Sequence, residues 1–84
     1  MTKRQIAEAL IASGISLRAL QVGFEILSEI GAEGHARIGS RALAERLRIG
    51  RHDVRDLVRE VEATGVIRSR FDGSHKIFEV RHAV

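Results

Sequence analysis

Two amphipathic helix patterns separated by only three residues constrain the fold of this chain most strongly. Residues 51–64 carry apolar side chains at the i, i+3, i+4, i+7 spacing that places them on one face of a helix. They are Val54, Leu57, Val58 and Val61. The preceding pattern, residues 41–47, has two leucines four residues apart, and we expect Ser40 to cap it. Because residues 48–50 leave so short a link, residues 40–64 are predicted to form a helix-turn-helix.

Beyond the second helix pattern, the period changes from that of a helix to that of a strand. Gly65 is a typical residue just past a helix C-terminus. The Asp-Gly dipeptide at 72–73 is a hairpin turn signal, and it lies between two β-prone runs, residues 66–71 and 76–80. A hairpin that directly follows a helix-turn-helix is the order of a winged helix, with residues 66–82 as the wing.

The N-terminal half predicts two more helices and a short strand. Thr2 and Gln5 have capping-box spacing at the start of a helix within residues 1–14. A second helix over residues 16–30 is expected to be capped by its first residue, a serine. It carries two apolar stripes, so we expect the first helix to cover one side and the rest of the domain to cover the other. The stripes are Leu17, Leu20, Phe24 and Leu27, and Val22, Ile26 and Ile30. Residues 35–40 could add a brief strand.

These patterns predict one domain over residues 1–84, mainly α with a small β-hairpin wing: a winged helix-turn-helix with an extra N-terminal helix. Because the chain has no cysteine, a disulfide scaffold and a thiolate metal site are excluded. No apolar run approaches the roughly 18 residues of a membrane span. Aromatic residues are only 4% of the chain, which argues against RNA readers that stack bases on exposed rings. We therefore expect a soluble, cytoplasmic protein that makes no membrane contact.

The positive charge is concentrated in the second half of the chain. Residues 41–84 hold ten basic and seven acidic residues, so they account for the whole net charge of +3. On a helical wheel, residues 51–64 present an apolar face, an acidic face and a basic face. The basic face consists of Arg51, His52, Arg55 and Arg59. Such a face is either an ordinary solvated surface or a site for a polyanion, and the helix-turn-helix context favours DNA.

Residues 42–67 resemble the winged helix-turn-helix of GntR-type regulators. The chain reads ALAERLRIGRHDVRDLVREVEATGVI there, against the family's turn, Ser/Thr-Arg-Thr-Thr-Val-Arg run and closing Glu-Ala-x-Gly-Leu-Ile. The resemblance implies that Arg41, Arg51 and Arg55 contact operator DNA and that the wing tip, residues 73–76, approaches the minor groove or the backbone. The expected architecture lacks the family's effector domain.

Three departures from the family pattern lie around the turn. Arg48 replaces a turn glycine, which would cost about 1–2 kcal/mol if the position is left-handed. Gly50 replaces the capping Ser or Thr and is a weaker cap. His52 and Asp53 replace a pair of threonines, and Asp53 would repel a phosphate that it faced.

The primary hypothesis is a sequence-specific protein that binds double-stranded DNA, a small transcriptional regulator. Its DNA contacts would divide between bases and phosphates. The bases would be read by Arg51, His52 and Arg55, and the phosphates held by Arg41, Arg59, Ser74, His75 and Lys76. A single module buries little surface, so a homodimer on a two-fold site is expected. Residues 1–14 are the candidate dimer element through Ile6, Leu10 and Ile11, although these side chains could instead cover the second helix within one chain.

The alternative hypothesis is a winged helix that binds protein, as an assembly module or as an inhibitor of a complex that handles nucleic acid. Four acidic residues on or beside the second helix of the motif keep this alternative open: Asp53, Asp56, Glu60 and Glu62. We expect no enzymatic activity, because no nucleophile lies in a convincing context with a base. We also expect no cofactor and no metal, since the four histidines fall on different elements. They are His35, His52, His75 and His82.

Overall fold

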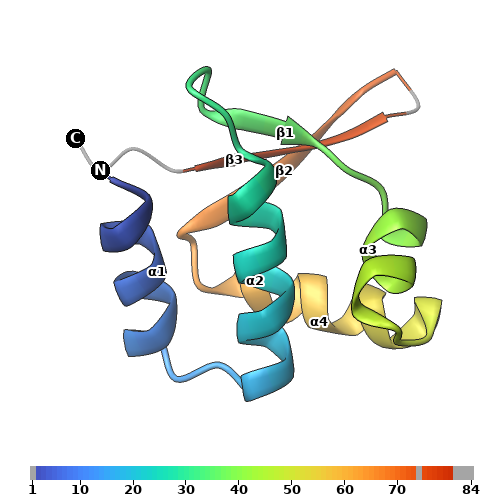
Figure 1. The fold of residues 1–84 in the computed structure, drawn as a ribbon, viewed down its shortest axis with the longest axis horizontal. Coiled ribbons are helices and arrows are strands. Elements are labelled where there is room, and N and C mark those ends of the chain that lie inside the picture. Colours follow the sequence, from blue (N-terminus) through green and yellow to red (C-terminus); the bar gives the residue numbers. More distant parts are fainter. Residues whose placement is uncertain (1, 74, 81–84) are drawn as a thin grey trace.

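The computed structural model describes residues 2–73 and 75–80 and places four helices beside a three-stranded antiparallel sheet (Figure 1). This confirms the mainly α fold with a small β-hairpin wing. The helices are α1 (Lys3–Ala12), α2 (Leu17–Glu29), α3 (Ser40–Leu47) and α4 (Arg51–Ala63). The strands are β1 (His35–Arg37), β2 (Ile67–Asp72) and β3 (His75–Val80), in the sheet order β1-β3-β2. In Figure 1, α1 lies at one end of the long axis, and the hairpin projects towards the other end, where α3 lies.

The first two helices begin where their capping residues predict. The Gln5 backbone N–H donates to Thr2 Oγ1 at 3.2 Å, and the Thr2 N–H donates to Gln5 Oε1 at 2.8 Å, so the capping box is complete. Ser16 Oγ accepts from the Ala19 N–H at 3.2 Å. Glu60 of α4 adds a contact that crosses the fold, because its Oε2 accepts from the Ser16 backbone N–H at 2.5 Å. A carboxylate at this position also complements the positive end of α2.

The third helix differs from the prediction at its start. Ser40 is already the first helical residue, and the N-cap is Gly39, which offers no side-chain acceptor. The helix ends at Leu47, and its C-cap is Arg48, whose φ of 55° and ψ of 46° place it in the left-handed region. A left-handed residue at this position ends α3 and lets the three-residue turn redirect the chain into α4. Arg48 is thus a side chain in a conformation that disfavours side chains.

Replacing Arg48 by glycine should stabilise the protein. Glycine adopts the left-handed conformation without strain, which raises the free energy of unfolding by about 1–2 kcal/mol. The greater freedom of glycine in the unfolded chain lowers it again by about 0.4–1 kcal/mol. We therefore expect the free energy of unfolding to rise by about 1 kcal/mol, measured by urea denaturation. Arg48→Ala is the matched control, because it removes the same charge but retains the strain. A glycine variant no more stable than the alanine variant would contradict this account.

Strand β3 is the centre of the sheet and pairs with both other strands. The short segment after α2 does form a strand, β1, whose Ala36 lies opposite Phe78. The hairpin is longer than predicted, because Asp72 pairs with His75 and therefore belongs to β2 rather than to the turn. Gly73 follows with a φ of +64°, a conformation that suits glycine.

Helix α2 lies at the centre of the core, but only one of its two predicted stripes is fully buried. Val22, Ile26 and Ile30 are buried as expected. Of the other stripe, Leu27 is buried, whereas Leu17 and Phe24 remain 74% and 38% exposed. The prediction that α2 is covered along both stripes is therefore wrong at these two residues.

The reason lies in how α1 approaches α2. Ile6 and Leu10 of α1 are 3% and 0% exposed, so they cover α2 within the chain. A Cβ built on Gly23 would lie 3.2 Å from Leu10 Cδ1 and 3.6 Å from Val61 Cγ2. Helices α1 and α4 thus both approach α2 at Gly23, and the edge that carries Leu17 and Phe24 is left uncovered. No helix within the described residues is long and apolar enough to cross a bilayer.

Candidate nucleic-acid interface

Helix α4 turns one face to the core and leaves its basic face in solvent. Val54, Val58 and Val61 are buried and anchor the helix. The four predicted basic residues are all exposed: Arg51, His52, Arg55 and Arg59. Among residues 2–73 and 75–80, no acidic side chain lies within 4.0 Å of the three arginines. Their charges are therefore free to meet a polyanion.

A groove of about 580 Å³ lies between α4 and the hairpin. It is lined by Arg37, Gly39, Ser40, Arg55, Val58, Arg59, Glu62, Phe71, His75 and Lys76. Four of the predicted site residues, two on α4 and two on β3, therefore meet in one groove, although 16 to 21 residues separate the two pairs in the sequence. They are Arg55, Arg59, His75 and Lys76.

Lys76 is partly neutralised at the wall of this groove. Its Nζ lies 3.1 Å from Glu62 Oε1, which also accepts a hydrogen bond from Ser69 Oγ at 2.7 Å. The same ammonium lies 5.3 Å from the centroid of the Phe78 ring, a cation–π distance. The ion pair ties this wing lysine to α4, and it makes Arg55 and Arg59 the stronger anion-binding groups of the groove.

Three other predicted site residues, Arg41, Arg51 and His52, do not line the groove. Arg41 is exposed in the first turn of α3, where its Nε lies 3.4 Å from Glu45 Oε1. Arg51 and His52 lie in the first turn of α4, at the end of the basic face. Ser74 lies outside the described residues.

Among the groove-lining residues outside the predicted site, Arg37 and Phe71 carry side chains suited to a ligand that sequence reasoning missed. Arg37 enters through the β1–β3 pairing, which local patterns do not reveal, and its Nη2 lies 3.5 Å from Asp72 Oδ2 at the wing. Phe71 is 70% exposed. Strand alternation from the buried Ile67 could have placed Phe71 on the inner side of β2, but only the structure shows that α4 does not cover it.

The acidic residues that support a protein partner do not form one free surface. Glu60 is used at the N-terminus of α2, and Glu62 is held by Ser69 and Lys76. Asp53 and Asp56 remain exposed on α4. Half of the acidic set is thus engaged in holding the domain together.

Arg46 fixes the position of α3 against α2. Its guanidinium forms an ion pair with Glu29 and lies 3.4 Å from Glu25, both on α2. The hydrogen bond to Glu29, together with the charge of both carboxylates, raises the pKa of Arg46 above its ordinary value. Because this arginine is committed to α2, it does not belong to the basic surface of α4.

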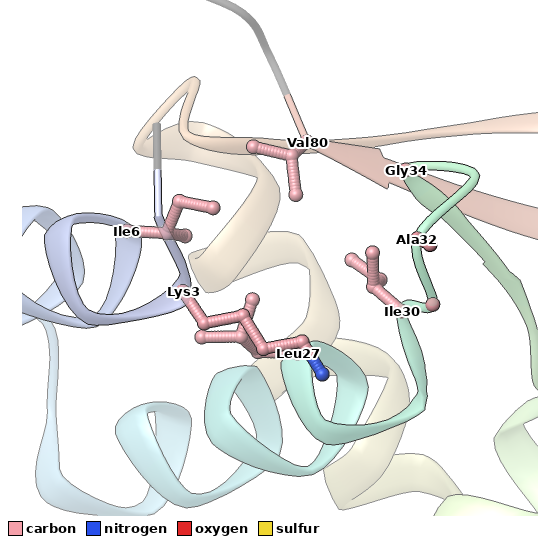
Figure 2. Close-up of a pocket in the computed structure, with 8 residues that line it drawn as sticks. Lys3, Ile6, Leu27, Ile30, Ala32, Gly34 and Val80 are labelled. Carbon is pink, nitrogen blue, oxygen red and sulfur yellow. The ribbon is translucent and has the colours of Figure 1, made fainter.

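A second hollow, of about 340 Å³, lies at the opposite end of the molecule between α1, the end of α2 and the end of β3. Figure 2 shows Ile6, Ile30 and Val80 pointing towards one another across it. Among the described residues that line it, Lys3 is the only one with a charged side chain. Within the described residues, no group of three or more His, Cys, Asp or Glu side chains could hold a metal ion.

No known family model matches the chain, and no curated protein matches it.

Proposed function

We propose that this protein binds double-stranded DNA in a sequence-specific manner and acts as a small cytoplasmic transcriptional regulator. The observation that carries the proposal is the arginine row on the exposed face of α4, which meets no acidic side chain among residues 2–73 and 75–80 and continues into a groove with further cations from the wing. A free cationic surface of this kind provides the phosphate attraction on which DNA affinity depends. The resemblance of residues 42–67 to GntR-type regulators supports the same function.

In this proposal α4 enters the major groove by its N-terminal end. Arg51, His52 and Arg55 read base edges, because the first turns of a recognition helix meet the bases. Arg41, Arg59 and Lys76 hold phosphates together with His75 and Ser74. No cofactor, metal or catalytic step is part of the proposed activity.

We also propose that two copies act together on a two-fold DNA site, because one module covers few base pairs. Ile6 and Leu10 are buried within the chain, so they do not supply the dimer contact that the sequence predicted for residues 1–14. The large apolar side chains that are exposed on α1 and α2 are Ile11, Leu17 and Phe24. They provide the surface that a second copy would use.

A salt titration of DNA binding tests the proposal. We expect the affinity for a selected duplex to fall with salt, with a log–log slope of about −3 per protomer, because Arg41, Arg59 and Lys76 would each neutralise one phosphate at about −0.9. Fluorescence anisotropy on selected and random duplexes measures the slope, and the stoichiometry at saturation reports the number of copies. Absence of salt-sensitive binding to any duplex would overturn the proposal.

The exposed Asp53 and Asp56 favour one other function, binding to a protein partner. That alternative predicts one stoichiometric protein in a pull-down and no retention of DNA.

A further inference from the structure

The ring of Phe71 stands apart from the other apolar side chains of the sheet. It is 70% exposed, whereas Phe78 of the neighbouring strand is 1% exposed. Phe71 pairs with Lys76, one step from the closing pair of the hairpin, so it lies near the tip of the wing. Isolated surface hydrophobic residues need no explanation in general. The exposure of Phe71 does need an explanation, because its ring lines the same groove as Arg55 and Arg59.

A partner that fits this groove must combine negative charge with a flat apolar surface. A DNA strand does so, since its phosphates alternate with sugars, and the base edges lie behind them. Each strand also separates the major groove from the minor groove. Suppose that α4 occupies the major groove and that one DNA strand lies along the cations between α4 and the wing. The wing is then on the far side of that DNA strand, where it meets the minor groove.

We propose that Phe71 is a specificity-determining residue that inserts its ring into the minor groove and partly unstacks one base step. This inference rests on the proposed DNA-binding function. Apolar side chains used in this way act as wedges that kink the duplex. Pyrimidine–purine steps unstack most easily, so the site should favour such a step under the wing. The preference would arise without any hydrogen bond from the wing to a base.

The variant Phe71→Ala tests the wedge. We expect it to bind the selected duplex about tenfold more weakly at every salt concentration, the order expected when burial of a phenyl ring is offset by unstacking. The salt slope should not change, because no charge is removed. A duplex carrying 2-aminopurine at the step under the wing should brighten with the natural protein and not with the alanine variant. Phe71→Leu should restore most of both signals.

Two comparisons separate failure of the wedge from failure of DNA binding. Phe24→Ala, which removes a ring on α2 outside the groove, should leave the 2-aminopurine fluorescence of the saturated duplex unchanged, even if loss of the second-copy contact lowers the affinity. Arg59→Ala should lower both the affinity and the salt slope. Natural affinity and fluorescence in Phe71→Ala, beside weakened binding in Arg59→Ala, would overturn the wedge alone. Tighter binding to single strands than to the duplex would also overturn it. If the natural protein binds no duplex, the proposed function itself fails.

Discussion

Replacing Gly23 with leucine is expected to destabilise the protein by about 3 kcal/mol or more, since this is the scale of severe overpacking in a core. Even a Cβ at Gly23 would lie 3.2 Å from Leu10 Cδ1 and 3.6 Å from Val61 Cγ2. Leu10 and Val61 are both 0% exposed, so neither has free space into which to retreat. A small domain has only about 0.05–0.15 kcal/mol of stability per residue, so a loss of this size removes much of the total.

Urea denaturation followed by circular dichroism measures the effect, and two variants bracket it. Gly31→Leu makes the same chemical change where no heavy atom lies within 4 Å, and it should cost little. Gly23→Ala combines a tight contact with a gain of about 1 kcal/mol in helix propensity, so it should be close to neutral. Equal stability of the two leucine variants would mean that α1 does not approach α2 at Gly23.

Much of the fold could be predicted because its signals are local. The caps at Thr2 and Ser16 set the starts of two helices, and the apolar spacing in α4 identifies its buried face. The exposure of Leu17 and Phe24 could not be predicted in this way. Both sit at helical spacing typical of a core, and only the line along which α1 crosses α2 decides that they stay uncovered.

In the candidate site too, only the features that depend on local sequence could be predicted. The basic row of α4 follows from helical periodicity alone. The contacts of Glu60 and Glu62 do not follow from periodicity, because their partners lie on other elements. Ser16 is 44 residues from Glu60, and Lys76 is 14 residues from Glu62. Arg37 likewise reaches the groove only through strand pairing. Side chains whose roles depend on contacts between elements carry no signal in a local pattern.

The double variant Arg55→Ala with Arg59→Ala is expected to lower the affinity for the selected duplex about a hundredfold or more, since a base-contacting arginine alone is worth about 1–3 kcal/mol. The two single variants should lower DNA affinity in different ways. Arg55→Ala should act mainly on the selected sequence, whereas Arg59→Ala should weaken all duplexes alike and reduce the salt slope by about 0.9, as loss of one phosphate contact does.

Unfolding cannot produce this result, because the two arginines are exposed and share a row with Arg51 at four-residue spacing. Removing like charges at that spacing relieves about 0.2–0.5 kcal/mol per pair, so the double variant should be slightly more stable than the natural protein. A loss of DNA binding accompanied by a small rise in thermal stability is the signature of a surface charge row maintained for a ligand.

The control variant Arg4→Ala with Arg18→Ala removes the same charge from α1 and α2, at two exposed residues that do not line the groove. Its effect should be small at physiological salt, where the Debye length is about 8 Å. Glu62→Gln should have the opposite sign and strengthen binding to all duplexes, because it frees Lys76 from its ion pair. Equal losses in the groove and control variants would reduce the interaction to net charge alone and would remove α4 and the wing as its site.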